Sequence, residues 1–454
     1  MRLLTYQILT TLALPFVAYK GYKRCKKHAL QHAQQPTLPA IVDCFKARFG
    51  LSRQPLQTDG IWIHAVSVGE TRSIFPLLSR LKLDYPSLPL TLTSGSTQGA
   101  MQALQFAPVP IQHQMIPYDY PFAINRFLSQ IKPKLVIMVE TEVWPNLYQA
   151  CSKRGIPIVL INARLKAQSF YAYQKWGGTM LANALNQTQW IGAQFKVDAD
   201  YFKALGAHSS KVKTLGNLKF DLALPKELEN QAQHWRSQQT EPERFIWVAA
   251  STHKSTDGQV IDEELMMLQA HQQLLTQHPN ALLILVPRHA DRFNDVAQML
   301  EQSSLNWARR STQQTVNANT QVYLADTIGE LMLWFAIGDV AFVGGSLVPF
   351  GGHNILEPAA LKKPVLSGPH YANLQALFEG LLQQNAVQIV HNTNDLARTL
   401  TTLAQDPHQR QQLGQQAYQA FSQQSGVLDK VMQHLSPLLL NTLPNTPSKN
   451  VPQN

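Results

Sequence analysis

The chain has 454 residues, of which 44% are hydrophobic and 15% charged, a balance that suits two globular domains of α/β type with a large core. Lys and Arg outnumber Asp and Glu by 39 to 29. The isoelectric point near 9.4 predicts an anionic partner, such as a nucleotide, a phosphorylated substrate or an acidic membrane surface. Outside the amino-terminal region the basic residues are dispersed and lack interleaved aromatics, which argues against nucleic acid.

The amino-terminal residues 1–28 are predicted to form a helix that associates with a membrane. Leu3 to Tyr19 is largely apolar and is followed by a basic cluster, which favours retention in the cytoplasm: Lys20, Lys23, Arg24, Lys26 and Lys27. The apolar part is at the short limit for a span and contains Pro15, so the helix either crosses the membrane or lies in its interface, where each cation contributes about 1 kcal/mol against anionic lipid. A soluble core helix is the alternative. A cleaved signal peptide is disfavoured, because no small-x-small cleavage site precedes the cluster.

The three cysteines, Cys25, Cys44 and Cys151, are scattered along the chain and show neither a CxxC pair nor the His/Cys spacing of a metal site. We interpret them as buried thiols in a reducing compartment, where a large core needs no disulfide. Neither a structural metal nor a cofactor is predicted.

After Pro39, short apolar runs alternate with longer helical stretches, the order expected of parallel sheets covered by helices. A first series of predicted strands comprises residues 61–66, 90–93, 135–139, 158–161 and 190–193. A second series comprises residues 245–249, 282–286, 321–324, 340–343 and 364–367. We therefore expect an α/β fold of two doubly wound, Rossmann-like domains, residues 29–222 and 223–436, facing each other across a cleft. Residues 437–454 are expected to be a disordered tail.

In the amino-proximal domain, the segment WIHAVSVGE places Glu70 where a strand gives way to a helix. A carboxylate in that position faces the predicted cleft and is suited to act as a general base on a hydroxyl group. Ser67 and Glu70 also have the spacing of a capping box, so a purely structural role is the alternative.

A second acidic site of this domain is VETEVWPN, which follows the predicted strand 135–139. The two-residue spacing places Glu140 and Glu142 on one side of an extended segment, beside Trp144. These acids are expected to bind hydroxyl groups of an acceptor. The alternative is that one of them only pairs with Arg164 of the segment INARL.

The carboxyl-proximal domain contains the most informative stretch, DVAFVGGSLVPFGGHNILEP, which runs from Asp339 to Pro358. A buried strand ends there in paired glycines, and a new helix follows. The glycines include Gly345, Gly351 and Gly352, which would let backbone amides approach a phosphate or a sugar nucleotide. The alternative is a tight turn in which Asn354 and Glu357 form only a capping box.

Three further loops would converge on the same site from the ends of neighbouring strands. AASTHK and LVPRH supply polar and cationic groups, namely Ser251, His253, Arg288 and His289. Arg288 is suited to grip a phosphate with two parallel hydrogen bonds, and Glu357 to bind a ribose diol. DTIGEL offers the backbone of Ile328 and Gly329 to a base edge, unless Thr327 and Glu330 only cap a helix.

Taken together, the segments resemble those of one family, and they occur in its order: HAVSVGE, SGSTQG, PYDYP, ETEVWPN, INARL, GNLKFD, STHK, PRH, DTIGELM, GGSLVPFGGHNILEP and GPH. The chain resembles the transferases of 3-deoxy-D-manno-octulosonic acid (Kdo) in lipopolysaccharide synthesis. The likeness extends from the amino terminus to about residue 435 and implies the GT-B glycosyltransferase fold.

The resemblance also implies a reaction. The donor would be CMP-Kdo, the acceptor a tetraacyl lipid A precursor, and the transfer would invert the configuration of the sugar without a metal ion, at the cytoplasmic face of the inner membrane. By the matched motifs Glu70 would be the base, Glu140 or Glu142 a second essential acid, and Asn162 with Arg164 would lie on the acceptor side. The residues matched to CMP binding are Arg288, Ile328, Gly329, Asn354 and Glu357.

The chain departs from the family pattern at two places, and two other functions are alternatives. Ile328 stands where relatives often have Met, and Pro349 and Phe350 precede the second glycine pair. A UDP-sugar epimerase or a UDP-N-acetylglucosamine transferase would share the architecture but would not account for HAVSVGE and ETEVWPN. A protein that binds nucleotide at the membrane surface without catalysis would use Glu70 and the other acids only as caps and ion pairs.

Overall fold

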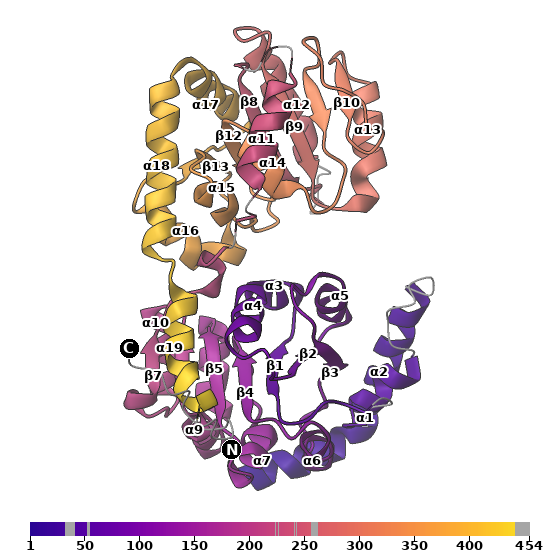
Figure 1. Cartoon of the computed structure of the whole chain (residues 1–454), viewed down its shortest axis with the longest axis vertical. Helices are drawn as coiled ribbons and strands as arrows, with labels where there is room; N and C mark the ends of the chain where they lie inside the picture. The colour runs from indigo at the N-terminus through magenta and orange to yellow at the C-terminus, as the bar shows by residue number, and fades with distance from the viewer. Residues whose placement is uncertain are drawn as a thin grey trace, which may run out of the picture. The chain divides into compact units, whose positions relative to one another are not determined.

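The computed structural model describes residues 1–31, 41–51, 55–222, 224–225, 227–239, 241, 243–255 and 262–440. The chain divides into two compact units, Met1–Asp221 with Ser425–Asn454, and Leu222–Gln424. Each unit is built on a parallel sheet of seven strands with helices on both faces (Figure 1). The predicted α/β class with two doubly wound sheets is therefore confirmed.

The sheet of the first unit reverses its strand order between β1 and β4. In chain order its strands are β1 (Ile61–Ala65), β2 (Leu90–Ser94), β3 (Gln112–Met115), β4 (Leu135–Val139), β5 (Ile158–Ala163), β6 (Ile191–Ala193) and β7 (Val212–Thr214). In space they follow the order β3-β2-β1-β4-β5-β6-β7. Successive residues of β1 and β4 enter opposite core clusters, Ile63 and Ile137 on one face and Trp62 and Val136 on the other. Burial on both faces is why these strands read as continuous apolar runs.

Helices cover this sheet on both faces. They are α1 (Leu3–Gln31), α2 (Ile41–Ala47), α3 (Val68–Ser73), α4 (Phe75–Asp84), α5 (Thr97–Phe106), α6 (Pro121–Ile131), α7 (Pro145–Lys153), α8 (Ala167–Trp176), α9 (Gly178–Gln187), α10 (Lys196–Ala204) and α19 (Val427–Leu440), with short 3-10 turns η1 (Ser209–Lys211) and η2 (Leu218–Phe220).

The second unit repeats the plan. Its strands are β8 (Ile246–Thr252), β9 (Leu282–Pro287), β10 (Trp307–Arg309), β11 (Val322–Leu324), β12 (Val340–Val343), β13 (Val365–Ser367) and β14 (Gln388–Ile389), in the spatial order β10-β11-β9-β8-β12-β13-β14. The order therefore reverses between β8 and β12. Its helices are α11 (Leu228–Ser237), α12 (Glu263–Leu275), α13 (Phe293–Glu301), α14 (Leu331–Ile337), α15 (Leu356–Ala360), α16 (Gln375–Leu382), α17 (Thr393–Gln405) and α18 (Pro407–Gln423), with turns η3 (Ala290–Arg292) and η4 (Ala372–Leu374).

The end of the chain differs from the expected domain limits. Residues 425–436 were assigned to the second domain, but α19 packs into the core of the first unit, where Val427 and Leu435 join Leu215 and Leu218. The Asp221 carboxylate also accepts the backbone N–H groups of Gly426 and Leu428. Residues 437–440 are helical, because α19 continues through them, and the rest of the predicted tail lies outside the described residues.

Helix α1 lies along the first unit beside α6 and α7 (Figure 1). The hydrogen bonds that fix it there include those from Gln7 Nε2 to Asn146 Oδ1 at 2.7 Å and from Tyr120 Oη to the carbonyl of Thr10 at 3.0 Å. The opposite face of α1 remains exposed and apolar, with Leu4, Ile8, Leu12, Phe16 and Tyr19 at helical spacing. In the part of the chain that the structure describes, no helix is long and apolar enough to cross a membrane.

Two of the three cysteines differ from the prediction. Cys25 of α1 and Cys44 of α2 form a disulfide, with their Cα atoms 5.9 Å apart. The prediction of a free thiol is wrong for this pair, because α1 packs against α2 and brings together two residues that are 19 positions apart. Cys151 is a free, buried thiol, as predicted.

Candidate active site

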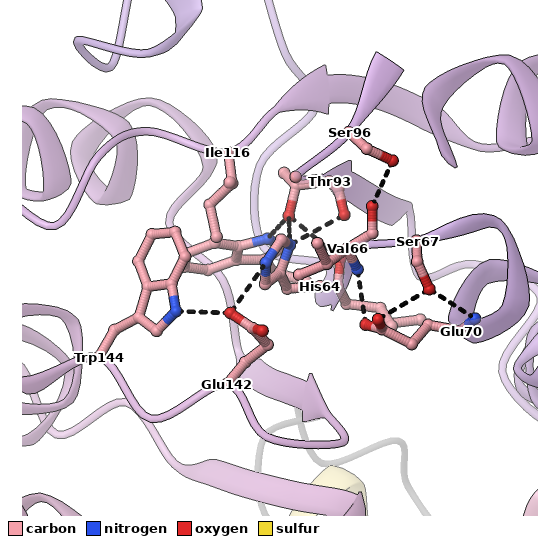
Figure 2. Close-up of polar contacts among 12 residues, drawn as sticks. His64, Val66, Ser67, Glu70, Thr93, Ser96, Ile116, Glu142 and Trp144 are labelled. Atoms are coloured by element: carbon pink, nitrogen blue, oxygen red, sulfur yellow. Dashed lines mark hydrogen bonds and ion pairs between the residues drawn. The ribbon is translucent and has the colours of Figure 1, made fainter. Parts of the chain in front are cut away.

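Glu70 lies at the carboxyl end of β1, where the strand order of the first sheet reverses. It is the third residue of α3, whose N-cap is Ser67. One carboxylate oxygen accepts the N–H of Val66 at 2.7 Å, the other accepts the Ser67 hydroxyl at 2.8 Å, and the Glu70 N–H donates to Ser67 Oγ at 3.3 Å (Figure 2). Half of the capping box, the alternative role from the sequence, is thus present, because Ser67 caps α3 but the Glu70 carboxylate accepts the N–H of Val66 and not that of Ser67. Each oxygen keeps a further lone pair, so the cap does not remove the carboxylate from chemistry.

Glu140 and Glu142 follow β4, the strand next to β1. Glu140 has a left-handed backbone with φ of 60° and is half-buried. Burial raises its pKa, and the nearby charge of Glu70 adds to the rise, while Lys219 and Arg164 oppose it. Burial also raises the pKa of Glu142 to about 7, against a hydrogen bond from Trp144 Nε1 to its Oε2 at 2.6 Å. The structure thus brings all three predicted acids to one place, at the switch point of the sheet.

His64 of β1 completes this cluster, and its role was not predicted although it lies within HAVSVGE. Its ring is buried and meets that of Trp144 edge to face, with centroids 5.5 Å apart. Nδ1 lies 3.0 Å from the carbonyl of Thr93, and Nε2 lies 3.9 Å from Glu142 Oε2 (Figure 2). Burial lowers the pKa of His64 to about 3, so the imidazole is neutral at pH 7.

Of the two predicted acceptor-side residues, Asn162 is hydrogen-bonded through its side chain and Arg164 through its backbone. Asn162 is buried with φ of 50°, and its Oδ1 accepts the N–H of Leu218 at 3.0 Å, so its oxygen holds the GNLKFD turn in place. Arg164 accepts the Thr141 hydroxyl through its backbone carbonyl at 2.7 Å. Among the described residues no ion pair within 4 Å joins its guanidinium to Glu140 or Glu142, although its charge, like that of Lys219, lowers the pKa of Glu140.

A mostly apolar pocket of about 450 Å³ adjoins the acids through Trp144. Its wall is formed by α1, the loop after Glu142, and helices α8 and α9: Met1, Tyr6, Asp119, Val143, Trp144, Pro145, Tyr173, Trp176, Gly177, Met180 and Leu181. The Tyr6 hydroxyl donates to Asp119 at 3.1 Å on this wall. A pocket of this size and lining suits a hydrocarbon chain.

In the second unit, a cluster of rings lies at the carboxyl ends of β8 and β12. His253 stacks on Phe350 with centroids 3.8 Å apart and on His353 at 4.8 Å, and its ring meets His289 edge to face at 5.0 Å. Burial and the charge of Arg288 lower the pKa of His353 to about 3, and burial, His289 and Arg288 lower that of His253 to about 4. Arg288 itself is exposed. Arg288 and the three histidines thus offer hydrogen-bond donors and one fixed positive charge, which suits an anion.

Several backbone amides of the glycine loop after β12 donate within the protein. The N–H groups of Gly345, Ser346 and Leu347 donate to the buried carboxylate of Glu263, at 2.6, 3.1 and 2.9 Å, and that of His253 donates at 3.1 Å. The N–H of Gly352 donates to the carbonyl of Gly345 at 2.8 Å. The amides of Gly345 and Gly352 therefore donate to other groups of the protein in this structure, and their contact with a ligand stays a prediction.

Glu263 is the residue that the sequence interpretation missed. It begins α12 and is fully buried. An acid in the first turn of a helix normally lies on the surface, so the sequence gives little sign that it organises a loop more than 80 positions away. The only signal is the run Asp262, Glu263 and Glu264 directly before an apolar helix.

The remaining predicted positions flank the ring cluster. Gly351 has φ of 110°, and Ser251, at the end of β8, has φ of 57°. Asn354 Oδ1 accepts the N–H of Leu356 at 3.2 Å, at the start of α15, a helix of five residues whose N-cap is Ile355, and Glu357 lies in its first turn.

In the loop after β11 the Thr327 hydroxyl donates to Glu330, which also pairs with Arg310 at 2.7 Å, but α14 begins at Leu331 with Glu330 as its N-cap, so these two residues do not form the capping box. Ile328 is nevertheless 73% exposed, and no atom lies within 4 Å of a Cβ built on Gly329. The outer face of this loop is therefore open.

Residues 43–222 match the family model described as 3-deoxy-D-manno-octulosonic-acid transferase (kdotransferase). The 3-deoxy-D-manno-octulosonic acid transferase of Haemophilus influenzae is 40% identical over 386 residues, which cover 84% of this chain and 87% of the relative. The solved C-terminal CMP-Kdo binding domain of WaaA from Acinetobacter baumannii is 36% identical, covers 43% of this chain and 98% of that chain, and has a TM-score of 0.40.

The solved UDP-GlcNAc 2-epimerase of Neisseria meningitidis, bound to UDP-GlcNAc, is 14% identical and has a TM-score of 0.53, with 84% of this chain and 100% of that chain covered. At this identity the likeness concerns the fold alone. It agrees with the GT-B type that the sequence predicted.

Proposed function

This chain belongs to the family of 3-deoxy-D-manno-octulosonic acid (Kdo) transferases, glycosyltransferases of lipopolysaccharide synthesis, and we propose that it transfers Kdo from CMP-Kdo to a tetraacyl lipid A precursor. The transfer inverts the configuration at the anomeric carbon and uses no metal ion. The observation that carries the proposal is the cluster of Glu70, Glu140 and Glu142 at the switch point of the first sheet, within the stretch that matches the family model.

The chemistry asks for one base. A hydroxyl oxygen of the acceptor forms a bond to the anomeric carbon of Kdo, the bond from that carbon to the phosphate oxygen breaks, and CMP leaves with the electron pair. The hydroxyl proton passes to the carboxylate of Glu70, which the Val66 N–H and the Ser67 hydroxyl hold in one orientation. A positioned carboxylate of this kind contributes about 10²- to 10⁴-fold to the rate.

The second unit is proposed to bind the donor. The leaving CMP is a stable anion that needs charge stabilisation more than a proton, and Arg288 beside His253, His289 and His353 supplies donors and positive charge for it. Ile328 and Gly329 offer an open backbone for the base, and Ser251, Gly351, Asn354 and Glu357 border the same ring cluster.

The acceptor is proposed to bind to the first unit. Its acyl chains are matched by the apolar pocket next to Trp144, and its phosphates by the cations near Glu140, which are Arg164, Lys166 and Lys219. Both features adjoin the acids, as the attack of an acceptor hydroxyl requires.

A mass-spectrometric assay tests this proposal, with full-length protein in detergent, CMP-Kdo and tetraacyl lipid A precursor. The lipid should gain the mass of each added Kdo. The variant Glu70→Gln keeps one acceptor oxygen and the backbone hydrogen bond to Ser67 Oγ, but it cannot take a proton, so we expect its rate to fall by about 10²-fold or more.

The matched control is Ser67→Ala, which removes the cap and leaves the carboxylate. We expect it to cost about 1 kcal/mol of stability and to keep most of the transfer. Full transfer by folded Glu70→Gln would show that Glu70 is only a cap. Binding of CMP by the wild type without any transfer would instead support a catalytically silent nucleotide-binding protein.

A further inference from the structure

The hydrogen bonds of His64 determine which of its ring nitrogens carries the proton. Nδ1 lies 3.0 Å from the backbone carbonyl of Thr93, which accepts hydrogen bonds and donates none. Nδ1 must therefore carry the proton of the neutral ring. The Thr93 hydroxyl, also 3.0 Å from Nδ1, already accepts from Trp62 Nε1 at 2.9 Å. Nε2 is thus left with a bare lone pair.

This lone pair points toward Glu142. Nε2 is buried, and among the residues described no group lies within hydrogen-bonding distance of it. The nearest charged atom is Glu142 Oε2 at 3.9 Å, which the N–H of Trp144 holds in place at 2.6 Å (Figure 2). If Glu142, whose side chain is 22% exposed, were ionised, the buried lone pair would face an anion, and the two would repel each other. A proton on Oε2 removes this repulsion, because the positive end of the O–H then faces the lone pair.

We propose that Glu142 works as an uncharged carboxylic acid whose proton, on Oε2, is directed at Nε2 of His64, and that His64 is the positioning residue of this acid. The pair then holds one proton in total. The protonation state rests on this contact and its surroundings, whereas its role in Kdo transfer rests on the proposed function.

The surroundings of the pair favour this state. Glu142 faces Glu70 of α3, Glu140 of its own loop, Tyr148 of α7 and Tyr173 of α8, and none of these groups is cationic. His64 is influenced by Arg48, whose positive charge disfavours an imidazolium. Burial raises the pKa of Glu142 to about 7 and lowers that of His64 to about 3, so below about pH 7 the carboxyl group and not the imidazole holds the proton of the pair.

A neutral Glu142 has a consequence for the substrates. The Kdo carboxylate, the donor phosphate and the acceptor phosphates are all anions, and three ionised carboxylates in one cluster would repel them. As a neutral acid, Glu142 still offers Oε1 as an acceptor for a substrate hydroxyl while it adds no negative charge. We therefore assign it to hydroxyl binding and leave proton abstraction to Glu70.

Infrared difference spectroscopy on the full chain tests the protonation state without any substrate. At pH 6 the wild type should show the C=O stretch of a buried, protonated carboxyl group that Glu142→Gln lacks and that disappears as the pH rises above 8. In His64→Phe, which keeps an aromatic ring beside Trp144, the band should move to higher frequency because the O–H of the acid no longer faces a lone pair. Absence of a band specific to Glu142, or a band unaffected by His64→Phe in protein with native circular dichroism, would overturn the proposal.

Transfer assays then test the role. Glu142→Gln imitates the neutral acid, with an amide N–H toward His64, so it should lose less of the wild-type rate at pH 7 than Glu142→Ala does and should lose the decline that the wild type shows at alkaline pH. Glu142→Ala should lose about tenfold or more. Equal losses in Glu142→Gln and Glu142→Ala would mean that the charge of Glu142 is required, and would overturn the proposed role. A wild type without transferase activity would count against the proposed function and would leave the infrared result standing.

Discussion

At the scale of single residues, the residue on which we expect the stability of the second unit to depend most is Glu263. Its carboxylate is fully buried and accepts four backbone N–H groups from the loops after β8 and β12. Glu263→Ala would leave four buried donors without an acceptor. We expect it to lower the free energy of unfolding by about 3 to 5 kcal/mol.

Urea unfolding, followed through the fluorescence of the buried Trp247 and Trp334, measures this loss. Glu263→Gln keeps one acceptor oxygen and should lose less than Glu263→Ala. Glu301→Ala, on an exposed position of α13, serves as the surface control and should change the stability by no more than about 0.5 kcal/mol. An unchanged midpoint in Glu263→Ala would show that the loops hold their conformation by other means.

Protonation of His353 should make the free energy of unfolding depend on pH. Burial and nearby positive charge lower its pKa to about 3, whereas in the unfolded chain it takes a proton below about pH 6.5. The unfolded state therefore binds more protons between these values, and stability is lost as the pH falls. Between pH 7 and pH 5 we expect the wild type to lose about 1 to 2 kcal/mol more than His353→Phe, in which a ring still stacks near His253.

Urea titrations of both proteins at pH 7, 6 and 5 give the slope of the free energy of unfolding against pH for each protein. The difference between the two slopes measures the contribution of His353, because the other buried groups titrate alike in both proteins. Equal slopes would mean that His353 takes up its proton in the folded protein, which would place it in a more polar setting than the stack beside His253 and Phe350 provides.

At the scale of elements, the glycine loop after β12 offers a matched pair of substitutions. A Cβ on Gly344 would lie 2.7 Å from Glu263 Oε2 and 2.8 Å from the carbonyl of Ser251, so Gly344→Ala forces Glu263 or β8 to move. A Cβ on Gly329 meets no atom within 4 Å, and only its φ of 95° opposes Gly329→Ala, at a cost of about 1 kcal/mol.

Calorimetric titration with CMP distinguishes the two. We expect Gly344→Ala to abolish binding and Gly329→Ala to retain it, because a contact through the backbone at 329 does not need the absence of a Cβ. Retained binding in Gly344→Ala would show that the donor does not use the loops that Glu263 organises.

The strands that the sequence predicted and those that it missed differ in one physical respect. All ten predicted strands exist, with ends shifted by at most three residues. They were predictable because a strand that is buried on both faces consists of consecutive apolar residues. The four missed strands, β3, β7, β10 and β14, are the edges of the two sheets. Edge strands are short and partly solvated, so residues such as Gln112 and Gln114 of β3 carry no apolar signal.

The candidate site shows the same division. Glu70, Glu140 and Glu142 were predicted because acids at the ends of buried strands stand out in an apolar context. The contacts that organise them were not, since His64 reaches Glu142, and Glu263 reaches Gly345, through the fold and not along the chain. Sequence spacing indicates local caps such as Ser67 with Glu70, but pairs separated by about 80 positions become visible only in three dimensions.

At the scale of the whole molecule, the two units share a plan in which chemistry follows the reversal of strand order. In the first unit the reversal lies between β1 and β4, beside the acids, and in the second between β8 and β12, beside the histidines. Loops diverge at such a point and leave room for a ligand at the carboxyl ends of the strands. The net charge of +10 is consistent with the proposal that both units bind anions.

The last prediction concerns α1 and the membrane. Leu4, Ile8, Leu12 and Phe16 recur every four residues and are 53% to 75% exposed, while the other face of the helix is hydrogen-bonded to the first unit. A basic cluster begins directly after this stripe, at Lys20. An amphipathic helix of this kind binds in the interface of an anionic membrane, through apolar burial and through attraction between lysines and lipid headgroups.

Sedimentation of full-length protein with phosphatidylglycerol vesicles measures this binding. Leu12→Glu removes the burial of one leucine, so we expect the partition coefficient to fall about tenfold or more, and 0.5 M salt to weaken the wild type by screening the lysines. Leu83→Glu, at a position of α4 that is also 75% exposed, is the control and should bind like the wild type. If both variants bound alike, the contact with lipid would have to lie elsewhere on the protein, and the apolar stripe of α1 would need another partner.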